Sequence, residues 1–462
     1  MIEGLKPYPE YKDSGLPWVG SAPIHWSQRR MKFLFGERTQ KGFPNEPLLA
    51  ATQTKGVVRK EDYGERTVTA SKDLHLLKLV EQGDFVISLR SFQGGIEVAH
   101  CRGIISPAYT VLTPRPGSRK AYFKYFFKSS DFINSLTLFV TGIREGQNID
   151  YVRLSRAYLP LPPEDEQEAI SRFLDHANER IERAIRSKKK LIALLNEQKQ
   201  AIIHRAVTRG LDATVPFKPS GIPWLGDIPK HWELTRLKHI SPQITVGIVI
   251  QPARLYVARG VPCLRSLNIS SGSISTQKLV FISQKGHRKN SKSHLRKDDV
   301  VVVRTGRTGI AVIVSEEFDG ANCIDLLIVR KSPRLTSKYL LAYLGSYGAK
   351  SDIAFNSVGA IQAHYNTETL GNLRIPLPSV AEQKEILDHL ETQLAPTDAA
   401  IARPEREIAL LREYRTRLTA DVVTGKLDVR EAARKLPEVA IEPEPTPETD
   451  ELLEIETEDV EA

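Results

Sequence analysis

The sequence predicts an α/β (α+β) protein built as a tandem duplication, in which two mixed α/β domains are separated by two long helices that pack on each other. Three observations predict it. A tryptophan motif occurs twice, a longer block occurs twice, and two β-branched runs align between the halves. Self-similarity at a fixed offset is the mark of a repeated structural unit. We therefore expect the function to be carried out twice.

The tryptophan motif reads SGLPWVGSAPIHW at residues 14–26 and SGIPWLGDIPKHW at residues 220–232. Eight of the thirteen positions are identical, and the two copies hold all four tryptophans of the chain. Their proline and glycine content predicts loops rather than helices. We expect the tryptophans to dock into the domain core or to brace it against the long block. Stacking on nucleic-acid bases is the alternative.

The longer block spans residues 159–212 and recurs at residues 375–428, without a gap. Acidic residues follow its first prolines, and Ser379 with Glu382 forms a capping box, so each copy should begin a helix. Gly210 and Gly425 mark the helix ends. Positions 170, 174, 177, 181, 184, 188, 191, 195, 198 and 202 follow the spacing of a coiled-coil seam. The residues expected to pair the helices are Ile170, Leu174, Ile181, Leu191, Leu195, Ile202, Leu390, Leu394, Ile408, Leu411 and Leu418.

The regions between the repeats carry strand signals. Residues 84–98 and 298–312 share the pattern D-x-V-[IV]-x-x-R-[ST]-x-x-x-G-I-x-V. It predicts a buried strand, a turn and a second strand. Further strands are expected at Tyr109–Thr113 and Asp325–Arg330, and helices near residues 119–131 and 336–347. The predicted domains are a first mixed domain (1–158), a first long helix (159–212), a second mixed domain (213–374), a second long helix (375–428), kinked near Pro396 and Pro404, and a disordered acidic tail (429–462).

The composition is that of a globular protein, with 26% charged and 41% hydrophobic residues. Three widely spaced cysteines predict neither disulfides nor a metal site, which favours a reducing, cytoplasmic location. No apolar run is long enough to span a membrane. Because residues 438–462 hold eleven acids and no Lys or Arg, the first 437 residues hold 65 basic against 45 acidic residues, a net charge of +20. Such an excess indicates a nucleic-acid partner.

Two sets of residues are the candidate DNA contacts. Residues 285–297 form a predicted basic loop without an acid, suited to phosphate contact, although a solvated surface loop is the alternative. The second set lies in the turns after the two aligned strands, where Arg and Gln can read bases. Because Arg90 and Arg304 recur in both halves, a structural or phosphate-binding role is also open for them. The candidates are Lys285, Arg288, Lys289, Lys292, Arg296 and Lys297, then Arg90, Ser91, Gln93, Arg304, Thr305 and Arg307.

A standalone DNA nuclease or methyltransferase is the alternative from another class, and a structural scaffold is the third. An adenine methyltransferase needs [ND]-P-P-[YF], and the nearest tetrapeptide, Ser106-Pro107-Ala108-Tyr109, lacks the first residue and the second proline. The sequence also lacks G-x-x-x-x-G-K-[ST] and H-E-x-x-H. We therefore predict no catalytic residue, no metal site and no cofactor in this chain.

The repeated G-x-P-W-x-G-x-x-P-x-H-W and L-P-L-P…E-Q-x-x-I signatures, in this order, resemble the specificity subunit of type I restriction–modification enzymes over about residues 8–430. The resemblance implies a DNA-binding subunit of a DNA methylation complex. Each mixed domain would be a target recognition domain reading one half of a split double-stranded DNA sequence. The two long helices would form an antiparallel coiled coil that sets the spacing between the half-sites and docks two modification subunits. Those subunits bind S-adenosylmethionine and methylate adenine, and two restriction (translocase and nuclease) subunits can join them.

Overall fold

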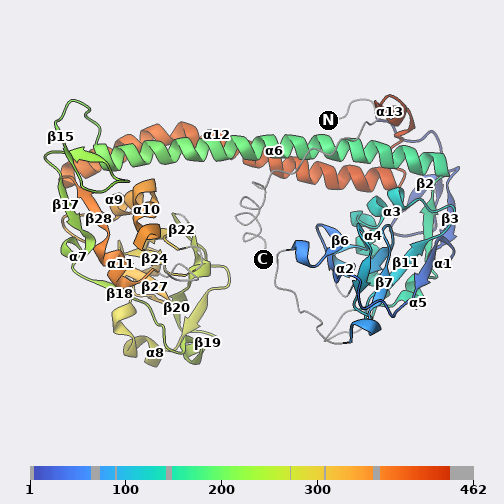
Figure 1. Ribbon diagram of the computed structural model, residues 1–462, viewed down its shortest axis with the longest axis horizontal. Coiled ribbons are helices and arrows are strands. Elements are labelled where there is room, and N and C mark those ends of the chain that lie inside the picture. Colours follow the sequence, from blue (N-terminus) through green and yellow to red (C-terminus); the bar gives the residue numbers. More distant parts are fainter. Residues whose placement is uncertain are drawn as a thin grey trace. The chain divides into compact units, whose positions relative to one another are not determined.

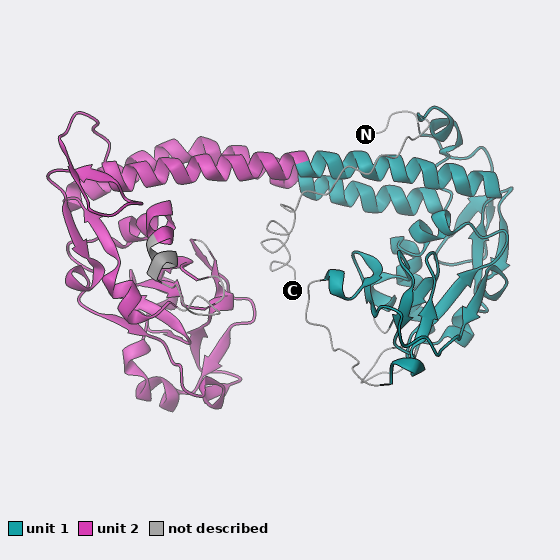
Figure 2. Cartoon of the chain, in the orientation of Figure 1, with its two compact units in different colours: residues 1–186, 408–462 teal, residues 187–407 magenta. Residues whose placement is uncertain are grey.

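The structure is a computed structural model that describes residues 5–63, 73–88, 91–141, 148–270, 272–305, 308–356 and 365–437 (Figure 1). The chain forms two compact units (Figure 2): unit 1 comprises residues 1–186 and 408–462, and unit 2 comprises residues 187–407. Both units mix helices with sheets, as predicted. The predicted disordered tail (429–462) begins with a helix instead, α13 (Arg430–Arg434), and from residue 438 onward it lies outside the described residues.

Unit 1 is organised around a four-stranded antiparallel sheet in the order β4-β11-β8-β9. All three residues of β8 are buried, as the β-branched run predicts. The elements are β1 (Tyr11–Asp13), β2 (Ser21–Pro23), β3 (Ser27–Arg30), α1 (Met31–Leu34), β4 (Phe35–Arg38), β5 (Leu49–Thr52), β6 (Gly56–Arg59), β7 (Lys78–Val80), β8 (Phe85–Ile87), α2 (Ser91–Gly94), β9 (Glu97–Val98), β10 (Gly103–Ile105), β11 (Thr110–Pro114), α3 (Lys120–Phe126), α4 (Ser130–Leu136), β12 (Val140–Thr141), β13 (Asn148–Ile149), α5 (Tyr151–Leu154), β14 (Tyr158–Leu161) and α13 (Arg430–Arg434).

Unit 2 contains a sheet of the same pattern, β18-β27-β24-β25, and a second four-stranded sheet, β19-β23-β20-β26, that unit 1 does not match among its described residues. The four valines of β24 are all buried. The elements are β15 (Phe217–Pro219), β16 (Asp227–Pro229), β17 (Glu233–Arg236), α7 (Leu237–Ile240), β18 (Ile244–Val246), β19 (Tyr256–Val257), β20 (Val261–Leu264), β21 (Ile269–Ser270), β22 (Ser273–Ile274), β23 (Val280–Ile282), α8 (Gln284–Lys289), β24 (Val300–Val303), β25 (Ala311–Ile313), β26 (Asn322–Cys323), β27 (Leu326–Val329), α9 (Ser337–Gly345), α10 (Tyr347–Asn356), α11 (Thr367–Asn372) and β28 (Arg374–Leu377).

Two long helices, α6 (Glu164–Arg209) and α12 (Val380–Val423), contribute to both units. Within unit 2 they run antiparallel, because Lys188 pairs with Glu407 while the later Lys199 pairs with the earlier Asp398. Within unit 1, Glu182 of α6 pairs with Arg415 of α12.

The apolar seam of α6 differs from the prediction after Ile181. The predicted seam includes Leu191, but this residue is 48% exposed, whereas its neighbour Ile192 is partly buried. The buried positions step from Ala177 to Ile181 and then to Ile185, two successive steps of four residues. Such a stutter shifts the apolar stripe by one position and unwinds the supercoil locally. A strict alternation of three- and four-residue steps therefore misplaces Leu191.

The prolines do not interrupt the second helix, because α12 runs from Val380 to Val423 with Pro396 and Pro404 inside it, and the kink expected there stays a prediction. A proline removes one backbone donor, but the adjoining turns keep their own hydrogen bonds. Pro404 is buried, three residues after Ile401 and four before Ile408, and so takes an apolar seam position. Packing against α6 within unit 2 offsets part of the missing hydrogen bond.

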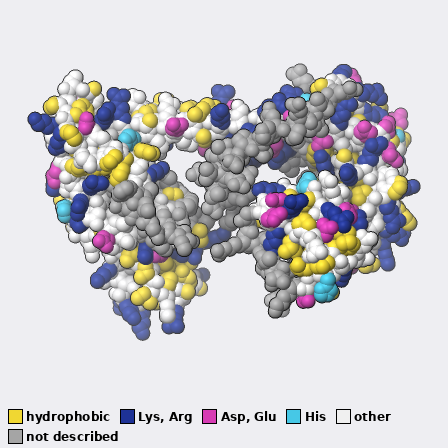
Figure 3. All heavy atoms as spheres, viewed as in Figure 1, with side chains coloured by type: hydrophobic (Ala, Val, Ile, Leu, Met, Phe, Trp, Pro, Cys, Tyr) yellow, Lys and Arg dark blue, Asp and Glu magenta, His cyan; other side chains and the backbone are white. Residues whose placement is uncertain are grey.

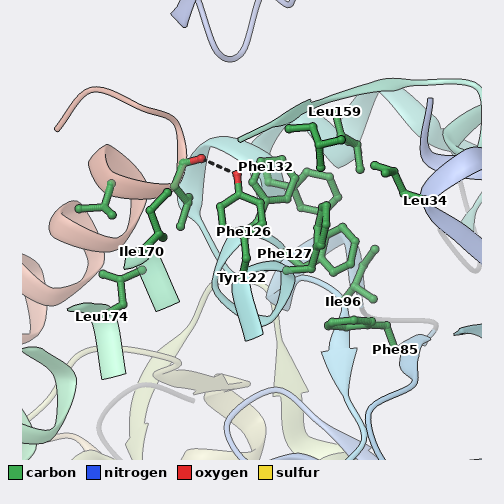
Figure 4. Close-up of a cluster of buried hydrophobic side chains, with 14 of the residues drawn as sticks. Leu34, Phe85, Ile96, Tyr122, Phe126, Phe127, Phe132, Leu159, Ile170 and Leu174 are labelled. Atoms are coloured by element: carbon green, nitrogen blue, oxygen red, sulfur yellow. Dashed lines mark hydrogen bonds between the residues drawn. The ribbon is translucent and has the colours of Figure 1, made fainter. Parts of the chain in front are cut away.

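The core of unit 1 joins the mixed domain to both long helices (Figure 4). Phenylalanines of α3 and α4 pack around Ile170 and Leu174 of α6, and around Leu418 of α12. The hydroxyl of Tyr122 donates a hydrogen bond of 2.9 Å to the Val423 carbonyl. The corresponding core of unit 2 contains Val207 of α6 and Ile386 of α12.

The same tryptophan–glutamate contact anchors the helices in both units. Trp26 donates from Nε1 to Glu166 at 2.9 Å, and Trp232 donates to Glu382 at 2.8 Å. Both indoles are 1% exposed. They therefore brace each mixed domain against the start of a long helix and are not available to stack on bases.

In each unit, a glycine at the end of the other long helix packs against the anchoring tryptophan. Gly425 follows α12 with a φ of +81° and faces Trp26, and Gly210 follows α6 with a φ of +72° and faces Trp232. A Cβ would stand 3.0 and 3.2 Å from the respective indoles. These positions need glycine for both the left-handed backbone and the close approach.

Candidate DNA interface

The strongest cluster of positive charge lies in unit 2, at the segment predicted as a basic loop. Much of it is helical instead: α8 covers Gln284–Lys289, and a 3₁₀ turn covers Ser291–Ser293. The Ser283 side chain caps α8 by accepting a hydrogen bond of 3.1 Å from Gly286 N. That cap explains why a glycine- and serine-containing stretch begins a helix. All six basic candidates of this segment are exposed: Lys285, Arg288, Lys289, Lys292, Arg296 and Lys297.

These six cations differ in whether an ion pair already engages them. Lys297 forms an ion pair with Glu316. Within the described residues, the other five have no acidic ion-pair partner. Those five are the better phosphate ligands, since an unpaired exposed cation needs to break no existing contact to bind.

A buried ion pair holds this segment in place. Arg330, which is 6% exposed, pairs with Asp299 and donates hydrogen bonds to the carbonyls of Lys292 at 3.0 Å and His294 at 2.7 Å. The rings of His287 and His294 are parallel, 3.7 Å apart. Burial and, secondarily, the charges of His294 and Arg288 lower the pKa of His287. Arg330 was not among the predicted site residues, because it positions the basic residues without being one of them.

The stretch of sequence that is basic and free of acids extends well beyond the predicted loop. Residues 234–297 contain twelve Lys and Arg and no Asp or Glu, in a chain with 56 acids. Arg254 and Arg259 belong to this acid-free stretch and are exposed, although they were not among the predicted contacts. Figure 3 shows Lys and Arg side chains gathered at the lower end of unit 2, where Figure 1 places α8 and β19.

The turn after β24 gives a different result. Arg304 pairs with Asp325 at 2.9 Å, and the Thr305 hydroxyl lies 3.3 Å from the same carboxylate. These contacts favour the structural alternative for Arg304. Arg307 lies outside the described residues, so its proposed base contact remains a prediction.

In unit 1, Ser91 is a structural residue. It is 1% exposed, and its hydroxyl accepts a hydrogen bond of 2.8 Å from Ser88 N, so it cannot reach DNA. Gln93 is exposed on α2 and is accessible to a ligand. Arg90 lies outside the described residues.

The exposed α2 turn is held from beneath by Lys128. Its Nζ lies 2.6 Å from Glu97 and donates to the carbonyls of Gly94 at 2.7 Å and Gln53 at 2.8 Å. Glu97 is 2% exposed. Burial raises its pKa to about 7, against the opposing charge of Lys128. One ammonium group thereby fixes both the turn that carries Gln93 and the turn after β5.

Metal-binding and membrane-spanning features do not occur in the described part of the chain. No three or more His, Cys, Asp or Glu side chains there are grouped so as to hold a metal ion. Nor does any helix there combine the length and apolar character that crossing a bilayer requires.

Comparisons with known proteins find similarity to DNA specificity subunits. The family model of the type I restriction modification DNA specificity domain matches residues 229–408. The specificity subunit of the type I restriction enzyme MjaVIII of Methanocaldococcus jannaschii is 25% identical over 298 residues, 63% of this chain and 66% of that protein. The EcoBI specificity subunit of Escherichia coli is 25% identical over 288 residues, and the match covers 59% of each chain.

A solved structure shows the same fold. It comes from work described as the structural basis of complex assembly and conformational transition of the type I R-M system. Its chain superposes with a TM-score of 0.55 at 17% identity, covering 87% of this chain and 98% of the other. Residues 229–408 thus match the type I restriction modification DNA specificity domain, and the chain is similar to specificity subunits of type I restriction enzymes over 59–63% of its length, the matches spanning 59–66% of those relatives.

Proposed function

We propose that this chain is a tandem duplication that reads a bipartite double-stranded DNA sequence, one half-site for each unit. The observation that carries the proposal is one anchoring arrangement repeated in two units whose exposed surfaces differ. The Trp26–Glu166 and Trp232–Glu382 contacts are alike. The basic stretch of residues 234–297, whose sequence holds no acid, belongs to unit 2, and the Lys128-supported turn belongs to unit 1. A common frame with divergent surfaces suits two different half-sites.

Reading DNA also needs affinity that does not depend on sequence. The exposed, unpaired cations of α8 and the following turn would contact phosphates and fix the register of unit 2 on the duplex. Base contacts would then come from neighbouring side chains. In unit 1, Gln93 has a side chain that can bind adenine through two hydrogen bonds.

We further propose that the long helices dock two copies of a modification subunit. Two copies of one partner require the same surface twice. Ala193, Leu194 and Glu197 of α6 recur as Ala409, Leu410 and Glu413 of α12, and all six are exposed. The two leucines are 55% and 57% exposed, so packing within this chain does not explain why they match. Residues spaced i, i+1 and i+4 lie on one face of a helix, which gives a small repeated docking stripe.

The chemistry of methyl transfer would belong to the partner. S-adenosylmethionine would bind the modification subunit, and this chain would supply the DNA sequence to be modified. Two restriction subunits could join the same assembly.

The test is adenine methylation of plasmid DNA by the purified chain, the modification subunit and both together, with methylated sites mapped by long-read sequencing. We expect methylation only with both proteins, at one split sequence. Methylation by this chain alone, or by the modification subunit alone at the same sites, would contradict the proposal.

A further inference from the structure

The tip of the segment between β18 and β19 exposes an unusual amount of apolar surface. Ile250 is 80% exposed and Val249 is 48% exposed. In water, exposing such side chains is unfavourable, and contiguous apolar patches on a soluble surface commonly mark a binding site. Tyr256 and Val257 of β19, each 38% exposed, extend the apolar surface along the same segment.

The tip is held at both ends, so it is preformed. Before it, Ile248 is 5% exposed, and its backbone nitrogen donates a hydrogen bond of 2.8 Å to the Cys323 carbonyl. After it, Gln251 takes a left-handed conformation with a φ of 44° and turns the chain into a 3₁₀ helix at Pro252–Leu255. The Leu255 carbonyl accepts a hydrogen bond of 3.0 Å from Ser283 N, at the start of α8. These contacts tie the apolar tip to the basic segment.

The charge around the tip selects the kind of partner. Arg254 and Arg259 are exposed in the same segment, and Lys285, Arg288 and Lys289 follow on α8. No acid occurs between residues 234 and 297. Figure 3 shows hydrophobic side chains beside Lys and Arg side chains at this end of unit 2. An acidic, apolar peptide would fit that charge, but so does duplex DNA, whose grooves present apolar groups between two rows of phosphates.

We propose that Val249 and Ile250 form an apolar reading element of unit 2, and that Ile250 contacts the C5 methyl group of a thymine in the major groove. That methyl group is the apolar mark by which a major groove distinguishes thymine, and aliphatic side chains can read it. The inference rests on the proposed function, since it assumes that unit 2 reads DNA. The inference adds a residue that determines sequence specificity, whereas the cations of α8 contact only phosphates.

Among its described residues, unit 1 has no pair of adjacent, exposed large apolar side chains like Val249 and Ile250. Both units contain a parallel bridge of this kind, between Leu48 and Ile104 in unit 1 and between Ile248 and Ile324 in unit 2. The residue after Leu48, Leu49, is 7% exposed and enters β5, whereas Val249 of unit 2 is 48% exposed. The described surfaces of the two units thus differ here, as reading two different half-sites requires.

The experiment uses the full chain with its modification subunit and a duplex carrying the mapped methylation site. Ile250→Ala should lower affinity for this duplex about fivefold or more and leave affinity for an unrelated duplex unchanged. Replacing one thymine of the second half-site by deoxyuridine, which lacks the methyl group, should weaken wild-type binding by a similar factor. The same replacement should cause no further loss in Ile250→Ala. Leu211→Ala, at a residue 44% exposed after α6, is the matched control and should bind like the wild type.

The inference is overturned if Ile250→Ala binds both duplexes as the wild type does, or loses the same factor on both. It is also overturned if replacing thymine by deoxyuridine weakens binding of Ile250→Ala as much as it weakens binding of the wild type, or if the second half-site contains no thymine. A third contrary result is an acidic peptide that displaces the duplex from the wild type but not from the variant. A wild-type complex that does not distinguish the two duplexes would instead refute the proposed function, and this inference with it.

Discussion

Glu166 accepts a hydrogen bond of 2.9 Å from the indole of Trp26, which precedes it by 140 residues. The same carboxylate accepts a bond from the Tyr8 hydroxyl and lies 2.8 Å from His25 Nε2. Its counterpart Glu382 binds Trp232 at 2.8 Å and His231 at 3.2 Å, but the Glu382 side chain is 26% exposed and that of Glu166 is 2% exposed. One contact is therefore used twice, at two levels of burial.

This difference predicts unequal losses of stability. Glu166→Ala should lower the free energy of unfolding by about 3 kcal/mol, because it leaves two buried donors, the Tyr8 hydroxyl and the Trp26 indole, without an acceptor. Glu382→Ala should lose about 1 kcal/mol, since water can replace part of its contacts. Urea unfolding would measure both. Glu168→Ala, at an exposed carboxylate of the same helix turn, is the control and should change little. Equal losses for Glu166→Ala and Glu382→Ala would contradict the role assigned to burial.

A second prediction concerns pH and Glu97. Because burial raises its pKa to about 7, the folded state binds a proton more tightly than the unfolded state does. Its stabilising contribution is therefore complete at low pH and is lost as pH rises from about 4.5 through 7. Glu97→Gln, which cannot ionise, should gain stability relative to the wild type over that window, by up to about 3 kcal/mol. The measurement is the difference in unfolding free energy at pH 5 and pH 8. A difference that does not depend on pH would refute the assignment.

Much of the fold was predictable because it repeats. The two tryptophan motifs, the two long helices and the aligned strands of β8 and β24 all follow from residues that recur at fixed offsets. The stutter near Ile185 was not predictable from spacing alone, since Ala184 and Leu191 are themselves apolar and keep the regular alternation of three- and four-residue steps. The place of Pro404 inside a continuous helix was not predictable for a related reason: the cost of a proline in a helix is general, but its burial at a seam position depends on the local packing.

The candidate contacts were less predictable. A composition rule found the basic segment of α8, but it could not distinguish Lys297, which is paired with Glu316, from its unpaired neighbours. The alignment of the two strand–turn segments assigned Ser91 to DNA, although that hydroxyl serves its own turn. Ion pairs between residues far apart in the sequence, such as Arg330 with Asp299, leave no local signal.

The ion pair of Lys297 predicts a graded salt dependence. Changing Lys285, Arg288, Lys289, Lys292 and Arg296 together to Ala should weaken binding of the complex to DNA. The slope of log K against log salt should become shallower by roughly 0.9 for each phosphate that no longer meets a cation. Lys297→Ala is the matched control from the same segment and should change the slope less, because its charge is already paired with Glu316. If Lys297→Ala changes the slope as much as an average member of the five, the ion pair does not matter for binding.

The repeated exposed leucines predict a change in stoichiometry. Leu194→Asp should leave one modification subunit bound, Leu410→Asp should leave the other, and the double variant should bind neither. Native mass spectrometry would count the subunits. Because both side chains are more than half exposed, the unfolding free energy should change by less than about 0.5 kcal/mol. Leu191→Asp, also exposed on α6 but matched by Glu407 in the repeat, is the control and should retain both subunits. Two subunits bound to the double variant would remove this stripe from the interface.

The last prediction concerns a chain cut after the first half. Unit 1 takes Leu418, Val422 and Val423 of α12 into its core, and a fragment of residues 1–218 lacks them. The repeat supplies substitutes, because Ile202, Ala206 and Val207 occupy the matching positions of α6.

A second copy of the fragment can offer those three residues where α12 normally packs, and the first copy can do the same in return. The exchange is reciprocal, so the product should be a two-fold symmetric dimer. Light scattering at micromolar concentration would detect it. Val207→Asp should abolish the dimer, whereas Leu194→Ala, at an exposed position, should leave it intact. With modification subunits, the dimer should methylate a split palindrome made of the first half-site and its inverted repeat. A folded monomer would contradict the proposed helix exchange. A dimer that methylates a non-palindromic site would contradict the assignment of one half-site to each unit.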